Sequence, residues 1–393
     1  MAQPHAVIIG GGVGGLTSAA ALHDRGWTVT VCERAPSFAA VDVGLAIAPN
    51  GLRALDSVGL GDLLRARAVP QGRTELRRVD GRRLLRFDEA DLRRRFGAEG
   101  MVVSRAALVE ALLGRLPATT VHTGVTVTDV EAGDIHGLAR VRTNAGELAA
   151  DLVVAADGLR SAVRDALFPD HPGPVYAGFT TWRFVAPAPD RPFSHGETWG
   201  RGAAFGVLPL PGGRVYCYAT ANAPAGRRGA DERAELLRLM GEWHDPVPSL
   251  LRSVAPRALV RADAWLLDTP LPAYHRGRIA LVGDAAHAMP PNLDQGVCQA
   301  MEDAAVLAHR ASSSAAYLPT ALASYTDARL ARTSHVVQRI AQLAELVQAE
   351  SPTMSRMRDI GVRTMSLLAP RRSVSRYLGS ILDWQPPART ALL

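Results

Sequence analysis

The sequence predicts an α/β protein in which a parallel sheet covered by helices is interrupted by an inserted antiparallel sheet and followed by C-terminal helices. Three observations carry this prediction. Short apolar strands end in a glycine-rich turn near residue 10 and in aspartates near residues 157 and 284, a pattern typical of parallel strands buried on both faces. Segments of alternating polarity indicate the inserted sheet, and a final stretch of helical apolar spacing indicates the C-terminal helices.

The N-terminal segment carries a nucleotide-binding pattern. Ala6–Ile9 is predicted as a strand, residues 10–15 supply GxGxxG, Leu16–Arg25 is predicted as a helix, and Trp27–Cys32 as a strand that delivers Glu33. In this Rossmann-like arrangement the glycines allow a tight turn close to a pyrophosphate, and the acidic residue binds ribose hydroxyls. We therefore expect an adenine dinucleotide to bind here.

Two further apolar strands each deliver an aspartate. Residues 151–164 are predicted as a strand, the pair Asp157-Gly158 and a helix, although an Asp-Gly turn is also common at strand ends. Ile279–Val282 leads to Asp284 at the edge of the sheet where such folds place their ligands. Gly296 then permits a flat ligand to approach the start of a helix, whose free N–H groups stabilise negative charge.

The motifs GDAAH, PP, QG and EDA within residues 283–304, together with the earlier GxGxxG and Asp-Gly, resemble those of the FAD-dependent aromatic hydroxylases. These are single-component flavoprotein monooxygenases typified by p-hydroxybenzoate and salicylate hydroxylases. The resemblance implies a glutathione-reductase-type FAD domain in which Asp284 binds the ribityl chain. It also implies that Asp157 takes part in FAD binding and nicotinamide use, and that N–H groups of the helix start face the N1–C2=O edge of the flavin.

The resemblance extends to weaker positions of the FAD site. Arg105 matches a family position that reaches the ribityl and phosphate region, and the Gly44 segment resembles the one that passes beside the isoalloxazine. Val127 lies in a predicted strand, VTVTDV, which in the family commonly contacts adenine through its backbone. For Arg34, a place over the adenosine and a solvated surface position both stay open. The expected FAD-binding residues are Gly10, Gly12, Val13, Gly14, Gly15, Glu33, Arg34, Gly44, Arg105, Val127, Asp157, Asp284, Pro291, Gly296, Val297 and Cys298.

The implied activity is monooxygenation. NADH or NADPH would reduce FAD, oxygen would form a C4a-hydroperoxyflavin, and one oxygen atom would pass to an aromatic or polyene-like small metabolite. The alternatives are a flavin halogenase or prenyl-chain reductase, and a protein that keeps FAD for a non-redox or structural role. The halogenase pattern WxWxI is not found, since Trp182 lacks the second tryptophan.

One position departs from the family pattern. Where the family has Gly-Gln-Gly, this chain has Asp294-Gln295-Gly296. A carboxylate there would oppose an anionic reduced flavin. Tuning of the flavin, orientation of substrate and exposure to solvent are all open for Asp294, and exposure to solvent is the simplest expectation.

The domains are expected to be discontinuous. Asp80-Gly81 predicts a hairpin turn between the strands Thr74–Val79 and Arg82–Phe87. We place the FAD-binding domain at residues 1–73, 98–168 and 276–330, the substrate domain at 74–97 and 169–275, and a C-terminal helical segment at 331–393. The substrate-pocket candidates are Arg183, Trp199, Phe205 and Tyr216, with Tyr218 on the same strand face as Tyr216.

Composition limits the remaining possibilities. The chain has 393 residues and a net charge of +6, and all 44 basic residues are arginines, which suggests a GC-rich, bacterial coding bias. No basic run is interleaved with aromatic residues, so no nucleic-acid partner is expected. Cys32, Cys217 and Cys298 have no metal-ligand spacing, and we expect no metal site and a reducing, cytoplasmic location. No signal peptide and no membrane insertion are expected, and a monomer and a homodimer are both possible.

Overall fold

The computed structural model describes residues 3–38, 43–311, 317–368 and 373–387. Its six-stranded sheet has the order β18-β19-β12-β1-β2-β8. The strands are β18 (His275–Arg276), β19 (Ile279–Leu281), β12 (Leu152–Ala155), β1 (His5–Ile9), β2 (Thr28–Glu33) and β8 (Val121–Thr123). All neighbours are parallel except β18 and β19. The three apolar strands of the sequence analysis are thus adjacent, and their carboxyl ends meet at one edge.

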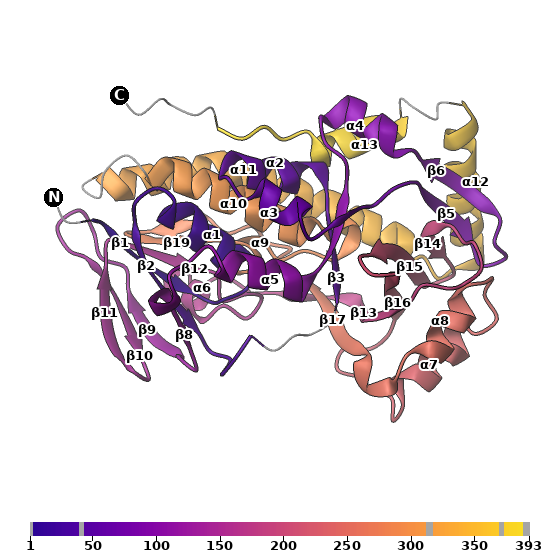
Figure 1. Cartoon of the computed structure of the whole chain (residues 1–393), viewed down its shortest axis with the longest axis horizontal. Helices are drawn as coiled ribbons and strands as arrows, with labels where there is room; N and C mark the ends of the chain where they lie inside the picture. The colour runs from indigo at the N-terminus through magenta and orange to yellow at the C-terminus, as the bar shows by residue number, and fades with distance from the viewer. Residues whose placement is uncertain (1–2, 39–42, 312–316, 369–372, 388–393) are drawn as a thin grey trace.

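Helices cover this sheet on both sides (Figure 1). They are α1 (Val13–His23), α2 (Pro49–Ser57), α3 (Gly61–Arg65), α5 (Arg105–Leu113), α6 (Ala162–Leu167), α9 (Asp284–His287), α10 (Gln295–Ala311) and α11 (Leu318–Val347). Residues of β1, β12 and β19 are fully buried in the largest hydrophobic core, together with Leu16 of α1 and Met301 of α10. The prediction of a doubly covered parallel sheet is confirmed.

Two small sheets flank the main one. The first is β9 (Val127–Glu131), β10 (Ala139–Thr143) and β11 (Gly146–Ala150), and the second is β3 (Gly44–Ile47), β4 (Val69–Pro70) and β7 (Met101–Ser104). Short 3-10 helices are η1 (Ala118–Thr120), η2 (Pro256–Ala258) and η3 (Asn292–Asp294). The segment containing Gly44 was predicted from residue 41 onward, and positions 41 and 42 lie outside the described residues.

The inserted sheet has seven strands in the order β17-β13-β16-β15-β14-β5-β6. They are β17 (Val260–Leu266), β13 (Val175–Pro187), β16 (Arg214–Asn222), β15 (Ala203–Leu210), β14 (His195–Trp199), β5 (Thr74–Arg78) and β6 (Arg83–Phe87). The predicted hairpin is confirmed, with Gly81 at a φ of 80° in the turn between β5 and β6. The sequence predicts a loop at His195, but this residue is the first of β14.

The alternation of side chains divides the inserted sheet into two faces. Trp182, Phe184, Phe205 and Cys217 pack with α7 (Glu232–Met240) and α8 (Val247–Ser253) in one core. The other face, which carries Tyr216, is turned away from these two helices. Only this second face is available to the site described below.

The last helices are α12 (Pro352–Leu368) and α13 (Ser373–Leu382), and α4 (Glu89–Phe96) lies beside α13 (Figure 1). Residues 356–382 have the apolar spacing that predicts helical structure; they include most of α12 and all of α13, and positions 369–372 lie outside the described residues. The guanidinium of Arg53 donates to the carbonyls of Leu382 and Trp384, and that of Arg332 donates to those of Ser380 and Ile381. Cations at the carboxyl end of a helix complement its dipole and its unpaired carbonyls.

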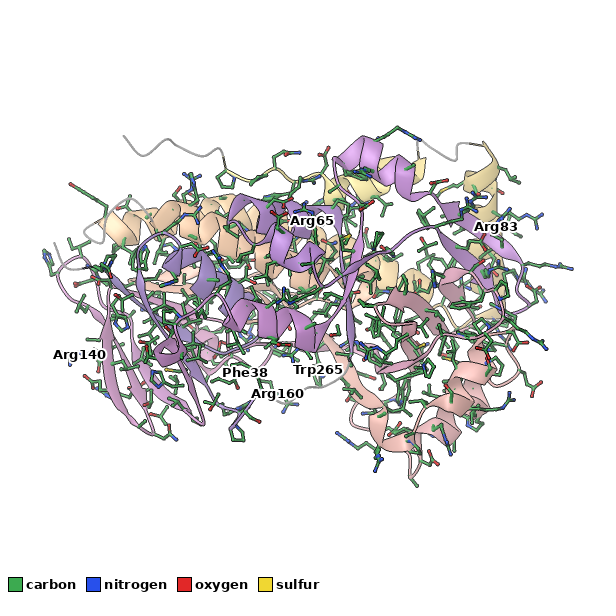
Figure 2. The ribbon with its side chains drawn as sticks, in the orientation of Figure 1. Phe38, Arg65, Arg83, Arg140, Arg160 and Trp265 are labelled. Carbon is green, nitrogen blue, oxygen red and sulfur yellow. The ribbon has the colours of Figure 1, made fainter. Side chains whose placement is uncertain are left out.

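The predicted discontinuous domains and their boundaries stay a prediction. The ranges 1–73, 276–330 and 331–393 each include positions outside the described residues. Exposed arginines such as Arg65, Arg83, Arg140 and Arg160 are spread over the surface (Figure 2). Within the described part of the chain, we find no helix with the length and apolarity needed to cross a bilayer.

A buried ion network joins α10 to α11 and to the turn after β19. Arg329 donates to Asp303 at 2.6 Å and to Glu302 at 2.5 Å, and all three side chains are fully buried. The Nε2 atom of His287 lies 2.6 Å from the second oxygen of Asp303, which also accepts from the Gly283 N–H. Burial alone would raise the pKa of Asp303, but the charges of His287 and Arg329 lower it to about 2. These contacts place His287 in a structural hydrogen-bonding network.

Candidate functional site

The glycine-rich loop leaves room beside its backbone. Gly10 has a φ of 104°, and a Cβ on it would lie 2.3 Å from the carbonyl oxygen of Ala156. A Cβ on Gly15 would lie 2.0 Å from the Gly10 oxygen, so neither position accepts a side chain. No atom lies within 4 Å of a Cβ on Gly12, and α1 begins at the next residue with no side-chain cap. Its first N–H groups are therefore free for a pyrophosphate.

Glu33 lies at the carboxyl end of β2 beside this loop. Its carboxylate accepts from the N–H of Gly11 at 2.6 Å and from that of Ala35 at 2.7 Å. The carboxylate therefore stands where the fingerprint places the ribose contact. Arg34 is exposed next to it, and its contact with adenosine stays a prediction.

Asp284 and the start of α10 face each other. One carboxylate oxygen of Asp284 would lie 3.6 Å from a Cβ on Gly296, so the missing side chain leaves this space open. Asp284 is exposed, and desolvation by the surrounding protein raises the pKa of its carboxyl, against the charges of His287 and Arg183, which lower it. The first N–H groups of α10 include those of Gly296, Val297 and Cys298. This arrangement fits FAD.

The side chain of Cys298 has a packing role. Its sulfur lies 3.4 Å from the Ala48 nitrogen, which donates to it, and against Gly51 of α2. Burial raises the pKa of this thiol to about 12, so the thiol is neutral at physiological pH. Any contact of this residue with the flavin would come from its backbone N–H.

Three other predicted FAD residues lie at or next to the ends of helices or strands. Asp157 accepts from the Ser161 hydroxyl at 2.6 Å and the Val163 N–H at 3.2 Å, and so caps α6. Arg105 is half-buried at the start of α5, where the Ser104 side chain is the N-cap. Val127 is the first residue of β9. Their contacts with FAD stay predictions.

Gly44 lies where β3 of the small sheet meets the inserted sheet. A Cβ on it would lie 2.3 Å from the ring of Tyr216, so β3 packs directly on this tyrosine of the inserted sheet. A Cβ on Gly206 would likewise lie 2.0 Å from the ring of Tyr218. The rings of Tyr216 and Tyr218 are 5.7 Å apart, on one face of β16 as expected.

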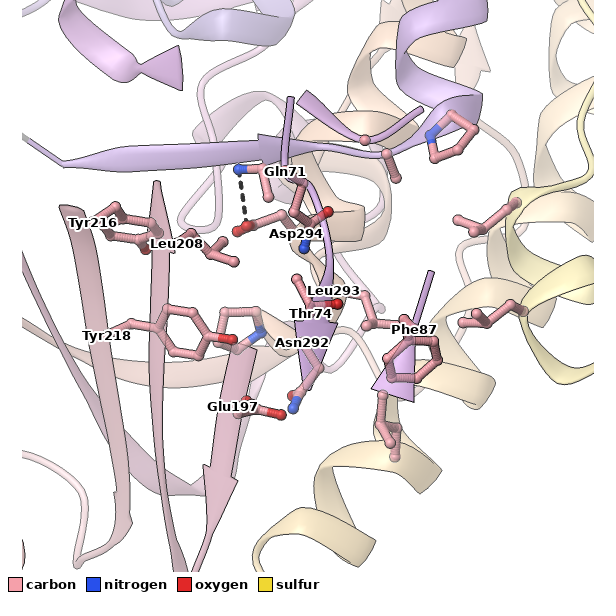
Figure 3. Close-up of a pocket in the computed structure, with 18 of the residues that line it drawn as sticks. Gln71, Thr74, Phe87, Glu197, Leu208, Tyr216, Tyr218, Asn292, Leu293 and Asp294 are labelled. Carbon is pink, nitrogen blue, oxygen red and sulfur yellow. Dashed lines mark hydrogen bonds between the residues drawn. The ribbon is translucent and has the colours of Figure 1, made fainter. Parts of the chain in front are cut away.

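The turn before α10 is strained. Leu293 and Asp294 have φ angles of 57° and 46°, a left-handed conformation that costs about 1–3 kcal/mol for each residue that is not glycine. Asp294 accepts a hydrogen bond of 3.0 Å from the Ala46 N–H, and its carboxylate lines a cavity (Figure 3). The expectation that Asp294 points to solvent is therefore wrong. Burial raises the pKa of this carboxyl to about 6, against the effects of Arg183 and Ala46.

The cavity has a volume of about 190 Å³ and lies between this turn and the inserted sheet. Arg183 lines it and makes no hydrogen bond or ion pair with any of the described residues. A half-buried guanidinium without a partner is available to bind an oxygen of a ligand. Pro291, beside Asp294, also lines the cavity.

Glu197 is a cavity residue that we did not predict. It accepts from the Trp199 indole N–H at 2.6 Å and lines the cavity together with Tyr218. Burial raises the pKa of Glu197 despite the hydrogen bond from Trp199. The alternation of β14 places Glu197 and Trp199 on one face, and that spacing was a usable sequence signal.

Two pocket candidates lie elsewhere. Phe205 is on the opposite face of the sheet, packed near Phe184 at a ring distance of 6.2 Å. Trp199 is on the cavity face but beyond the cavity, under the guanidinium of Arg358. Neither lines the cavity, whereas Arg183, Tyr216 and Tyr218 do. We find no group of metal-ligating side chains among the described residues.

Comparison with known proteins agrees with this geometry. Residues 4–340 match the family described as FAD binding domain. The chain is 35% identical to the aurachin C monooxygenase/isomerase of Stigmatella aurantiaca, over 92% of this chain and 94% of that protein. It is 34% identical to the 3-amino-4-hydroxybenzoate 2-monooxygenase of Streptomyces cremeus, over 86% of each. The crystal structure of Klebsiella pneumoniae HpxO with FAD and uric acid has a TM-score of 0.87 at 26% identity, over 97% of this chain and 96% of that one.

The fold, the glycine loop and the Asp284 cleft, together with these relatives, define an FAD-dependent monooxygenase. The predicted resemblance to FAD-dependent aromatic hydroxylases is confirmed. The chain belongs to the FAD binding domain family.

The glycine loop offers a test of cofactor placement. Because the space beside Gly12 is open, Gly12→Ala should leave the apoprotein folded but place a methyl group against the pyrophosphate. We expect the Kd for FAD to rise at least about tenfold through lost backbone hydrogen bonds, measured by fluorescence titration of the apoprotein. Gly361→Ala, which also meets no neighbour, is the control. Equal FAD affinity in both variants would place the pyrophosphate elsewhere.

Proposed function

We propose that the enzyme transfers one oxygen atom from O2 to an aromatic or polyene-like small metabolite, with NADH or NADPH as electron donor. The observation that carries the proposal is the cavity, which is lined by the unpaired guanidinium of Arg183 and by the carboxyl groups of Asp294 and Glu197. Asp294 lies just before α10 and is hydrogen-bonded to β3 through Ala46. The names of the relatives, which refer to aurachin C, urate and 3-amino-4-hydroxybenzoate, support an aromatic substrate.

FAD, when bound, supplies the activation of oxygen. The residues that would hold it are the glycine loop, Glu33, Asp284 and the start of α10. The chain's own contribution is to bind and orient the substrate and to exclude water around it. The residues that line the cavity therefore determine which substrate binds.

Each polar group in the cavity has a distinct proposed role. Arg183 binds a carbonyl, phenolate or carboxylate oxygen. Asp294, which accepts a hydrogen bond from the Ala46 N–H and whose pKa burial raises to about 6, accepts a proton from an O–H or N–H of the ring. Glu197 and Tyr218, which both line the cavity, fix the orientation of the ring.

The test uses the FAD-loaded enzyme without oxygen. Aromatic acids, phenols and N-heterocyclic aromatics are screened for acceleration of flavin bleaching by NADH and by NADPH. We expect at least one compound to accelerate bleaching, because these groups match the cavity. Bound FAD that neither nicotinamide reduces with any compound would contradict the proposed electron donor.

The ionisation of Asp294 predicts a pH dependence. With a folded pKa of about 6, the base is lost as pH falls through 6, so kcat/KM should fall in that range. Asp294→Asn should lower kcat/KM by roughly 10²-fold or more and remove this acid limb. An unchanged acid limb in Asp294→Asn would assign the limb to another group, and exposed Asp268→Asn is the control.

The same raised pKa predicts a change in stability. Because the pKa of Asp294 in the folded protein lies above that in the unfolded chain, ionisation of Asp294 destabilises the fold, and Asp294→Asn should gain more stability at pH 8 than at pH 5.

We also propose a cytoplasmic protein that acts as a monomer or homodimer on a small molecule and has no nucleic-acid partner. Cys32, Cys217 and Cys298 are buried free thiols, which supports a reducing location.

A further inference from the structure

The two ends of the cavity differ in chemistry. The end formed by the inserted sheet carries Arg183, Glu197, Tyr216 and Tyr218. The opposite end is lined mainly by the apolar side chains of Phe87, Leu343, Leu378 and Leu382, and Thr74 lies opposite Phe87 across β5 and β6. Figure 3 shows Phe87 on the side of the cavity away from Tyr216 and Tyr218. These groups line one continuous cavity, so one ligand can reach both ends.

The apolar end is built by helices that are held in place. Leu343 belongs to α11, and Leu378 and Leu382 belong to α13. Leu382 packs in a core with Ile381, and its carbonyl accepts from Arg53.

The fixation of α13 extends to the helix that starts at the FAD cleft. Arg332, which donates to two α13 carbonyls, also binds Glu302 of α10 at 3.0 Å. Arg332 therefore links α13, which carries Leu378 and Leu382, to α10, whose start lies beside Asp284. The apolar side chains of α13 thus form a fixed part of the cavity.

An apolar wall has a definite ligand preference. The side chains of Phe87 and the three leucines offer no partner to a hydroxyl, amide or carboxylate, so burying such a group against them costs free energy. An alkyl group gains by leaving water, and the gain grows with each methylene. A compact polar substrate would leave this end of the cavity unused.

We propose that this apolar end is a subsite for an alkyl or isoprenoid chain attached to the aromatic ring of the substrate. The ring lies at Arg183, Asp294 and Glu197, and the chain runs between α11 and α13. The inference rests on the proposed function for the position of the ring, and it adds the class of substituent that the substrate carries.

The experiment measures binding to the FAD-loaded enzyme by calorimetry, with phenol, 4-propylphenol and 4-heptylphenol as probes. We expect Kd to fall by about fourfold for each methylene over the first part of the series. The same Kd for all three probes would overturn the inference, because the apolar end would then contribute nothing.

Matched variants on one helix separate the subsite from general hydrophobic attraction. Leu343→Trp fills the apolar end, whereas Leu346→Trp lies on the same helix at an exposed position. We expect Leu343→Trp to keep the Kd of phenol within about twofold and to abolish the fall in Kd with chain length. Leu346→Trp should retain that fall. Equal chain dependence in both variants, or equal weakening of all probes by Leu343→Trp, would overturn the inference. Leu378→Trp replaces Leu343→Trp if the latter fails to bind FAD.

Binding is independent of turnover, so the two proposals fail separately. Chain-dependent binding without any oxygenated product would contradict only the proposed function. Oxygenation that proceeds with no chain dependence of binding or of KM would contradict only the subsite.

Discussion

Replacement of Arg183 by methionine is expected to lower kcat/KM for the substrate by roughly 10²-fold, with FAD content unchanged. The side chain of Arg183 lines the cavity and has no partner among the described residues, so its hydrogen-bonding capacity is available to the ligand. A hydrogen bond to a charged group contributes about 1.5–3 kcal/mol, which corresponds to this loss. The measurement is steady-state oxidation of NAD(P)H with the compound identified by the anaerobic screen.

A second readout separates a binding role of Arg183 from a structural one. Arg183 lowers the pKa of Asp294, so its removal should move the acid limb of the pH profile to higher pH. Arg201→Met, at an exposed position, is the control for loss of an arginine. If Arg183→Met retains wild-type kcat/KM and the same acid limb, the guanidinium does not face the substrate.

Replacement of Arg329 by methionine is expected to destabilise the protein by about 3–5 kcal/mol. The change leaves Asp303 and Glu302 buried without their shared cation. Because the same network holds Gly283 and His287 beside Asp284, FAD binding should weaken as well. The measurement is the urea midpoint of the apoprotein together with the Kd for FAD.

Arg65→Met provides the contrast to the buried network. Arg65 pairs with Asp56 at 2.7 Å, but both side chains are 41% exposed. Exposed pairs contribute about 0–1 kcal/mol, so this variant should unfold near the wild-type midpoint. Similar losses in the two variants would mean that the buried network contributes no more than a surface ion pair.

The cofactor half of the molecule was predictable because its signals are local. The glycine loop, Glu33 and Asp284 each lie at the end of an apolar strand, and parallel strands bring those ends to one edge. The hydrogen bond of Asp294 to Ala46 joins residues that lie far apart in sequence. The strained backbone at Asp294 was likewise not indicated by its neighbours in sequence. A pattern of residue types therefore gave no information about where that carboxylate points.

The substrate half was only partly predictable for the same reason. Alternation placed Tyr216 and Tyr218 on one face, but it did not say which face of the sheet meets the cavity, and Phe205 is on the other. Trp199 is on the correct face and beyond the cavity, because the position along a strand depends on what packs above it. The leucines of α13 join the site through contacts of high sequence separation, which helical periodicity does not reveal.

The most direct test of monooxygenation follows the oxygen atom. The FAD-loaded enzyme, NAD(P)H and the compound that accelerates flavin bleaching are incubated under ¹⁸O2, and the product is analysed by mass spectrometry. A product heavier than the substrate by one ¹⁸O atom is the predicted result. Complete oxidation of NAD(P)H with recovery of unlabelled, unchanged substrate, for every compound that stimulates bleaching, would contradict it.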